Sequence, residues 1–347
     1  MALKIPFDVT RQNIYYIDVR SESEFEQGHI VGAVNMPILN DQERHDVGTL
    51  YKQVSVEEAK RLGLKVASGK VIDYFDAICR IKAESPDAAI AFYCARGGFR
   101  SRSITQLLQG IGENVHCLDG GYKNYRHQVL DYLDTPSKYP KFIMVHGLTG
   151  VGKTKLLTGL MRKGYPVLDL EGAANHKGSH LGAIGTNEIQ RMQMFENTVF
   201  HQLAASPAEY AFVESESKRI GSIYVPPKLF EAIRSGEHIM VQRNLENRIK
   251  ALIDEYCGAE NFEPLIWPAF DRIRPYLSKE AYTRMAEELQ SAQYEAFVAD
   301  ILTKHYDPIY QKSIKNYVYD LSIQAETDES GINALAQWYD TTHAASL

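Results

Sequence analysis

The chain has 347 residues, of which 44% are hydrophobic and 24% charged, as expected for a globular protein of about two domains. The net charge of −6 argues against nonspecific nucleic-acid binding through the whole surface, although it leaves room for a local basic groove. No apolar run approaches the roughly 18 residues of a membrane span, and the N-terminus lacks a signal-peptide pattern. We therefore expect a cytoplasmic protein with no membrane partner.

The first part of the chain alternates short apolar strands with helices. Strands are predicted at Ile14–Val19, Ala88–Tyr93 and Asn114–Leu118, and helices at Ser21–Gln27, which begins with a Ser-x-x-Glu capping box, and at Ser101–Leu108. This alternation indicates an α/β fold with a parallel sheet. The polar segment 131–140 contains two prolines and is the predicted boundary, so the first domain is expected to cover residues 1–135.

A second α/β unit follows this boundary. Its predicted strands are Lys141–Val145, Tyr165–Leu170, Tyr210–Glu214 and His238–Gln242. They define an expected core at residues 136–245, which carries a phosphate-binding loop. Residues 246–347 are predicted to form a helical region packed on this core, with one long amphipathic helix at Tyr282–Lys304.

The segment around Cys94 has the features of a reactive cysteine loop. Cys94 lies between a buried strand and a helix, and Gly97 and Gly98 allow the backbone between them to curl. Backbone N–H groups at the helix N-terminus, with Arg96, Arg100 and Arg102 nearby, would create a positive field. We expect this field to favour the thiolate form of Cys94, a nucleophile that faces an anion-binding loop.

Residues Gly147–Thr154 match the phosphate-loop pattern G-x-x-x-x-G-K-[ST] in full, between a predicted strand and a helix. Its glycines Gly147, Gly150 and Gly152 would let backbone amides bind phosphate oxygens. Lys153 should reach a terminal phosphate, and Thr154 could hold a magnesium ion. No tightly bound cofactor is expected.

Acidic side chains near this loop are candidate metal ligands or supporting groups. They are Asp169, Glu171 and Glu214, at the ends of two predicted strands. Neither strand has the standard ending of an ATP-hydrolysing enzyme, and these acids could also simply cap the segments that follow. ATP hydrolysis is therefore not inferred, and the metal requirement stays open.

Several motifs in the first domain resemble the rhodanese-like family. They are Asp18-Val19-Arg20, Glu24-Phe25, Gly28-His29-Ile30, Gly32-Ala33, Asn35, Pro37 and Asp119-Gly120-Gly121-Tyr122. Cys94 falls where that family carries its sulfur- or selenium-bearing cysteine, whereas Asp18, Arg20 and His29 are expected to be structural. The segment from Cys94 to Arg100 also matches Cys-x5-Arg, the pattern of cysteine phosphatases, so the loop alone leaves both chemistries open.

The order of the two domains resembles the tRNA 2-selenouridine synthase family. Segments between the common motifs carry this resemblance, among them Asn40–Arg44, Asp169–Gly172, His176–Ser179, Glu214–Ser217 and Tyr306–Tyr310. At Tyr93 some relatives have a second cysteine, so a mechanism that needs adjacent thiols is not available here.

The resemblance implies that sulfur in 2-thiouridine, at the wobble position of certain tRNAs, is replaced by selenium from selenophosphate. It also implies an S-geranylated intermediate, made from geranyl diphosphate. The phosphate loop would then bind the diphosphate of the geranyl donor, and the Cys94 loop would bind selenophosphate or carry selenium.

Candidate contacts to tRNA phosphates are Arg191, Lys218, Arg219, Arg243 and Arg248. An alternative interpretation is a sulfurtransferase or cysteine phosphatase fused to a small-molecule kinase. A third is a nucleotide-regulated binding module in which Cys94 is a redox sensor.

Overall fold

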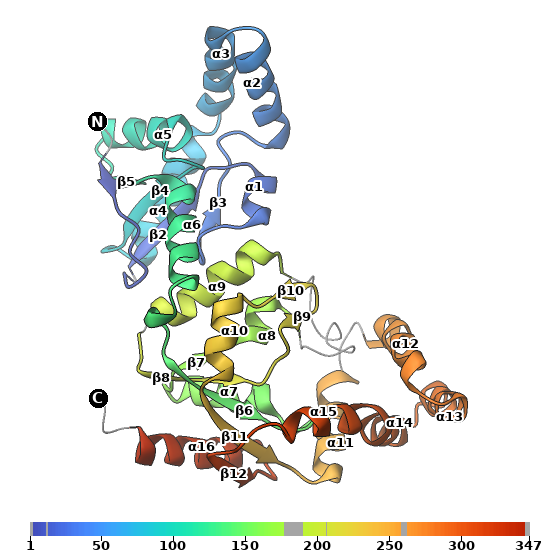
Figure 1. Ribbon diagram of the computed structural model, residues 1–347. Helices are drawn as coiled ribbons and strands as arrows, with labels where there is room; N and C mark the ends of the chain where they lie inside the picture. The colour runs from blue at the N-terminus through green and yellow to red at the C-terminus, as the bar shows by residue number, and fades with distance from the viewer. Residues whose placement is uncertain (1–2, 12, 177–189, 206, 258–261, 344–347) are drawn as a thin grey trace. The chain divides into compact units, whose positions relative to one another are not determined.

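The computed structural model describes residues 3–11, 13–176, 190–205, 207–257 and 262–343 (Figure 1). Within these residues the chain divides into two compact units. The first consists of Met1–Leu133 and Glu196–Ala205, and the second of Asp134–Phe195 and Ser206–Leu347. The helix α9 (Met192–Ala204) therefore begins in the second unit, while its residues from Glu196 onward pack in the first, which the sequence did not indicate.

The first unit is built on a five-stranded parallel sheet with the strand order β1-β5-β4-β2-β3. Its strands are β1 (Lys4–Ile5), β2 (Ile14–Asp18), β3 (Val34–Asn35), β4 (Ala89–Tyr93) and β5 (Val115–Leu118). Its helices are α1 (Glu22–Gln27), α2 (Asp41–Gln53), α3 (Val56–Ser68), α4 (Val71–Glu84), α5 (Phe99–Gly110) and α6 (Gly121–Leu133). The parallel pairing of these strands confirms the predicted α/β fold. Strand β4 is apolar throughout, as expected for a strand in the interior of the sheet.

Local sequence signals position several of these helices. The predicted capping box at Ser21 and Glu24 is present at α1, and Asn40 with Glu43 forms a second one at α2. The helices α2 and α3 pack against each other as a hairpin (Figure 1).

The second unit contains another five-stranded parallel sheet, with the order β12-β11-β6-β8-β7. Its strands are β6 (Lys141–His146), β7 (Val167–Leu168), β8 (Tyr210–Glu214), β11 (Glu237–Gln242) and β12 (Leu321–Gln324), and a separate antiparallel ribbon is formed by β9 (Arg219–Ile220) and β10 (Ile223–Tyr224). Helices α7 (Lys153–Arg162), α8 (Leu170–Ala174), α10 (Pro227–Arg234) and α16 (Asp328–Thr342) belong to the same core. Because β6 is the central strand, its carboxyl end presents the phosphate loop in the middle of the sheet.

The C-terminal region is less uniformly helical than predicted. It contributes strand β12, which pairs with β11, and helix α16, which packs on α7. The remaining helices are α11 (Leu245–Tyr256), α12 (Phe262–Ile273), α13 (Lys279–Gln290), α14 (Tyr294–Ile301) and α15 (Asp307–Ile314), and a π-helix spans Leu302–Tyr306. Short 3₁₀ helices lie at Pro136–Lys138 and Arg274–Tyr276.

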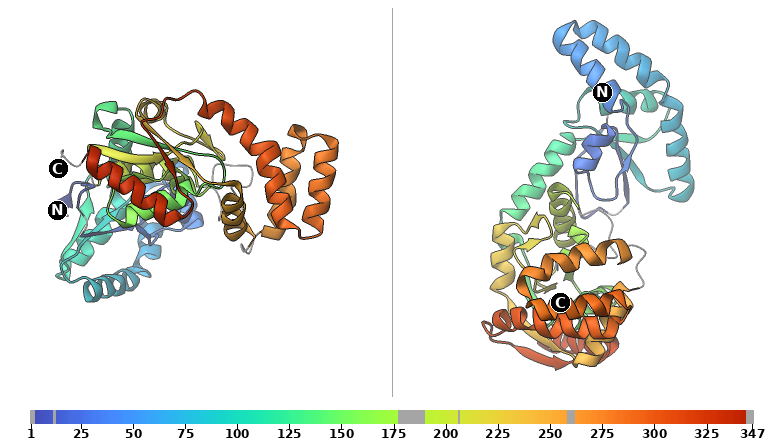
Figure 2. Two further views of the ribbon diagram at one scale, coloured as in Figure 1. Left: turned by 90° about the horizontal axis from the view of Figure 1, so that it is seen from below. Right: turned by 90° about the vertical axis from the view of Figure 1, so that its right-hand side faces the viewer.

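Helices α11, α12, α13 and α14 enclose an apolar core of their own, and α12 to α14 lie side by side in both further views (Figure 2). The prediction of a single long helix at Tyr282–Lys304 is wrong. The helix is interrupted between α13 and α14, where Ala292 has a φ of +54°, a value that no α-helix accommodates.

Candidate functional site

The Cys94 loop rests on a buried polar framework at the end of β4. The backbone N–H and two guanidinium nitrogens of Arg20 donate to the carboxylate of Asp18, the shortest of these hydrogen bonds at 2.6 Å, and the guanidinium group also donates to the carbonyl oxygen of Gly28. The hydroxyl of Tyr93, directly before the cysteine, accepts a hydrogen bond from the backbone of Ile30. Asp18 and Arg20 are therefore structural, as expected from the sequence, because their charges neutralise each other in a buried ion pair.

The turn after β5 holds the cysteine loop from the other side. Backbone N–H groups of Tyr122 and Lys123 donate to the carbonyl oxygens of Cys94 and Ala95, both at 2.9 Å. Gly121 has a φ of +59°, and a Cβ there would collide with the carbonyl oxygen of Cys94 and the amide of Gly97. Glycine is required at this position for both reasons, which explains why the second glycine-rich turn accompanies the cysteine.

The sulfur of Cys94 is a hydrogen-bond acceptor in this loop. The backbone N–H of Gly98 and the hydroxyl of Ser101 each donate to its Sγ at 3.2 Å. Both donors belong to the start of α5, so the N-terminus of this helix faces the sulfur. Cys94 itself is only 4% exposed. Two hydrogen-bond donors and the N-terminal end of the helix dipole therefore act on the same sulfur atom.

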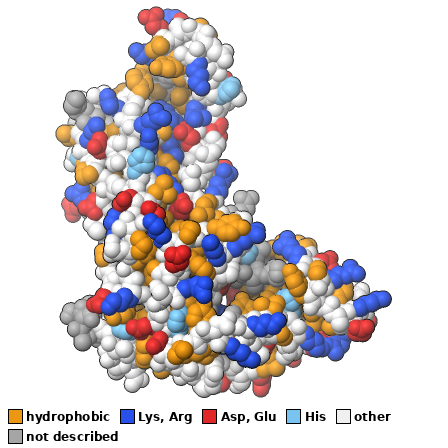
Figure 3. All heavy atoms as spheres, viewed as in Figure 1, with side chains coloured by type: hydrophobic (Ala, Val, Ile, Leu, Met, Phe, Trp, Pro, Cys, Tyr) orange, Lys and Arg blue, Asp and Glu red, His pale blue; other side chains and the backbone are white. Residues whose placement is uncertain are grey.

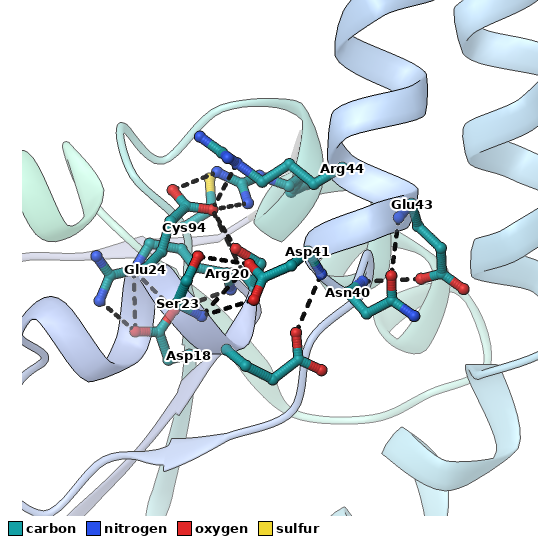
Figure 4. Close-up of polar contacts among 12 residues, drawn as sticks. Asp18, Arg20, Ser23, Glu24, Asn40, Asp41, Glu43, Arg44 and Cys94 are labelled. Atoms are coloured by element: carbon teal, nitrogen blue, oxygen red, sulfur yellow. Dashed lines mark hydrogen bonds and ion pairs between the residues drawn. The ribbon is translucent and has the colours of Figure 1, made fainter.

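The carboxylate of Glu24 lies beside the Cys94 loop, close to Arg44 (Figure 4), and it engages one of the predicted arginines. Arg100 forms a two-pronged ion pair with Glu24, with distances of 2.7 and 3.1 Å, and Arg44 binds the same carboxylate. Burial would raise the pKa of Glu24, but the hydrogen bond and charge of Arg100, with Arg44, lower it. Arg96 and Arg102 are exposed, so they are the cations of the predicted set that remain open to solvent.

The phosphate loop connects β6 to α7 in the predicted manner. Gly152 precedes the first turn of α7 with a φ of +87°, a conformation that favours glycine, and leaves the helix N-terminus uncapped by any side chain. The amine of Lys153 lies over the loop, where it donates to the carbonyl oxygen of Gly147 at 3.3 Å. A pocket of about 440 Å³ opens on this loop, and Gly150, Gly152, Lys153 and Thr154 are among its lining residues.

Carboxylates gather beside the hydroxyl of Thr154. This hydroxyl donates to Glu171 at 3.0 Å and lies 3.3 Å from Glu214. Oxygens of Glu171, Glu214 and Glu216 all lie within 4.8 Å of one another. Burial, with the charge of Glu216, raises the pKa of Glu171 to about 8, and burial with the charge of Glu171 raises the pKa of Glu214 well above its usual value.

This group has the composition of a magnesium site. All its donors are oxygens, which Mg²⁺ prefers, and one carboxylate oxygen of Glu214 is buried without a hydrogen-bond partner among the described residues. Asp169, predicted as a possible ligand, has another role: its carboxylate caps α8 by accepting from the N–H of Gly172 at 2.8 Å. Glu216 takes its place, since residues two apart at the end of a strand lie on the same side.

Two of the predicted tRNA contacts are buried inside the second unit, and this prediction is wrong for both. Arg243 donates to the carbonyl oxygen of Ala325 and pairs with Asp328, each at 2.7 Å. Arg248 donates to the carbonyl oxygen of Thr149, in the phosphate loop, and pairs with Asp307. Both side chains are 4% exposed, so they hold the loop region together instead of meeting a large ligand.

The other three predicted contacts are exposed. Arg191 lies directly before α9, and Lys218 and Arg219 lie at the start of the β9–β10 ribbon. Lys218 and Arg219 line a second cavity of about 1050 Å³, to which Gly147 and His176 also contribute. Residues 177–179, which belong to one of the motifs noted in the sequence, lie outside the described residues.

Sequence reasoning did not single out Arg234, Arg272 or Tyr310 as parts of a site. Arg234 and Arg272 line the second cavity, and Tyr310 lies between the two cavities, with its ring 5.9 Å from the amine of Lys153. Tyr310 belongs to a recognised motif and could have been found by it. The two arginines belong to helices distant in sequence and carry no local signal.

Comparison with known proteins supports the combination of these two sites. Residues 8–128 match the rhodanese-like domain, and residues 140–344 match the AAA domain of tRNA 2-selenouridine synthase. The chain belongs to the tRNA 2-selenouridine synthase family. Members of this family are transferases that modify tRNA, so this chain is an enzyme of that class.

Individual family members are similar along most of the chain. The tRNA 2-selenouridine synthase of Psychromonas ingrahamii is 32% identical, over 86% of this chain and 87% of its own. That of Hydrogenovibrio crunogenus is also 32% identical, over 87% and 90%, and that of Bdellovibrio bacteriovorus is 38% identical, over 71% and 65%. Among the described residues, none of the helices is both long and apolar enough to cross a membrane.

Proposed function

We propose that this enzyme replaces the sulfur of 2-thiouridine by selenium at the wobble position of tRNA. Selenophosphate supplies the selenium, and the reaction passes through an S-geranylated nucleoside made from geranyl diphosphate. The proposal rests on family membership and on one structural observation. The chain carries two different loops suited to anions, a phosphate loop with an oxygen-rich ligand group beside it and a cysteine loop at the N-terminus of a helix.

The phosphate loop would bind the diphosphate of the geranyl donor. Backbone N–H groups at the start of α7 and the amine of Lys153 would stabilise the negative charge that develops on the departing diphosphate. The C–O bond of the donor breaks, a bond forms between that carbon and the sulfur of the nucleoside, and N3 of the base loses its proton. Thr154, Glu171, Glu214 and Glu216 would hold Mg²⁺, which would neutralise part of the diphosphate charge.

Geranylation makes the second half of the reaction possible. An alkylated sulfur departs from carbon 2 as a thiol, whereas the unmodified sulfur is a poor leaving group. The Cys94 loop would bind selenophosphate. Its selenium would attack carbon 2 and displace the geranyl thiol, and water would then cleave the Se–P bond, so that phosphate is released and selenium stays on carbon 2. The exposed Arg96 is suited to the phosphoryl oxygens.

The alternative of a cysteine phosphatase is less well supported by the geometry. A Cys-x5-Arg phosphatase needs the guanidinium group of its arginine to face the phosphate. In this loop the guanidinium group of Arg100 is held by both oxygens of Glu24. No observation favours a small-molecule kinase over the transferase.

Mass spectrometry of nucleosides tests the proposal directly. Incubation of 2-thiouridine-containing tRNA with the enzyme, selenophosphate and geranyl diphosphate should yield 2-selenouridine and a geranylated intermediate. Cys94→Ser should abolish selenation but retain geranylation, with the exposed Cys79→Ser as its control. Lys153→Ala should reduce geranylation, with the exposed Lys250→Ala as its control. Unchanged 2-thiouridine with the active wild-type enzyme would refute the reaction.

A further inference from the structure

The second unit contains a cavity far larger than a diphosphate requires. Its volume is about 1050 Å³, compared with about 440 Å³ for the pocket on the phosphate loop. The elements around it come from both the sheet core and the C-terminal helices: the ribbon β9–β10, α10, α12 and α15. Figure 3 shows lysine and arginine side chains around the hollow on this face of the second unit. The cavity can therefore admit a second and larger substrate.

The charge of the cavity lining is strongly positive. Lys218, Arg219, Arg234 and Arg272 line it, whereas Glu216 is the sole carboxylate among its described lining residues. Within the described part of the chain, no carboxylate forms a salt bridge with any of these four cations. Because unpaired cations around one hollow repel each other, the arrangement is stabilised when a polyanion binds.

Aromatic rings lie among these cations. Phe230 and Tyr317 line the same cavity and are half-buried, and the guanidinium group of Arg234 lies 5.9 Å from the ring of Phe230. Positive charge beside half-buried aromatic rings matches a single RNA strand, which presents both phosphates and bases. Binding of a free phosphate or of a protein partner does not require both the cations and the aromatic rings.

We propose that this cavity binds the anticodon loop of the tRNA, with phosphates on Lys218, Arg219, Arg234 and Arg272 and a splayed base against Phe230 or Tyr317. The assignment rests on the proposed function and adds to it the place where the nucleoside is held.

The position of the cavity relative to the phosphate loop supports this assignment. Gly147, the first residue of the loop, lines the cavity, and Glu216 and Tyr310 line both the cavity and the phosphate-loop pocket. A nucleoside in the cavity and a diphosphate ester on the loop would thus meet across these two side chains. Such proximity is what a transfer from the ester to the sulfur of the base requires.

RNA binding by the full chain tests the charged part of the proposal. We would measure the affinity for an RNA hairpin with a tRNA anticodon loop, by fluorescence anisotropy at several salt concentrations. The variant Lys218→Ala/Arg234→Ala/Arg272→Ala should bind more weakly, and its salt slope, log K against log salt, should be shallower by about 2, since each phosphate contact on a single strand contributes about 0.7. Lys250→Ala, which removes an exposed cation outside the cavity lining, should leave the slope unchanged.

A crosslink tests the aromatic part and does not depend on folding of a variant. A 4-thiouridine at the wobble position, irradiated in the wild-type complex, should crosslink to peptides that contain Phe230 or Tyr317. Crosslinks confined to other peptides, or a triple variant with the wild-type salt slope, would overturn the assignment. Loss of RNA binding in the triple variant, together with no modified nucleoside from the wild-type enzyme, would support the RNA site while refuting the proposed reaction.

Discussion

Arg248 joins the phosphate loop to the C-terminal helices, and its removal should destabilise the second unit severely. Its guanidinium group donates to the carbonyl oxygen of Thr149 at 2.8 Å and binds both oxygens of Asp307, at 3.0 and 2.5 Å. The side chains of Arg248 and Asp307 are 4% and 14% exposed. In Arg248→Met, the carboxylate of Asp307 would remain buried without its counter-charge.

The size of the effect follows from this burial. Breaking a buried ion pair by removing one partner costs about 3–5 kcal/mol of unfolding free energy. With a urea m-value of about 2 kcal/mol/M, this loss lowers the urea midpoint by about 1.5–2.5 M. Removing the other charge as well, in Arg248→Met/Asp307→Leu, should recover part of the loss, because no unpaired charge is then left inside.

Tryptophan fluorescence during urea unfolding measures this effect in the second unit alone. Both tryptophans of the chain, Trp267 and Trp338, belong to that unit. Arg284→Met is the control, because Arg284 also pairs with carboxylates but its side chain is 50% exposed, where an ion pair contributes about 0–1 kcal/mol. A midpoint for Arg248→Met no lower than that of Arg284→Met would refute the reasoning.

Three further predictions concern pH, the cysteine loop and metal binding. Burial lowers the pKa of His146 from 6.5 to about 3, so the unfolded chain takes up a proton that the native chain does not, and stability should fall by about 2 kcal/mol from pH 7 to pH 5. His146→Gln should remove this part of the pH dependence, and an unchanged slope in urea titrations would contradict it. Gly121→Ala should distort the loop and slow alkylation of Cys94 by iodoacetamide, whereas Gly110→Ala, which has open space around it, should react like the wild type. Magnesium should raise the thermal midpoint of the second unit, and Glu214→Gln should weaken this effect, so equal shifts in both proteins would exclude the carboxylate as a ligand.

The sequence by itself determined the features that depend on local backbone geometry. A parallel strand that is buried on both faces must be apolar along its length, which identified β4 and β6. A phosphate loop and a cysteine loop are short segments whose glycines, cations and following helix are adjacent in the chain. Lys153, Thr154 and Cys94 could therefore be placed in their loops from the order of residues alone, and the resemblance to the rhodanese-like family implied a structural role for Asp18 and Arg20.

Other parts of the sites were decided only by the tertiary structure, because their partners are distant in sequence. Arg248 is an ordinary polar residue of an amphipathic helix until Asp307, 59 positions later, removes it from solvent. Arg234 and Arg272 become parts of one cavity because the fold brings α10 and α12, which are distant in sequence, to the same lining. Such long-range contacts decide whether a cation can bind a ligand or is paired with a carboxylate of the protein. Burial and ion pairing are properties of the folded chain and not of the single residue.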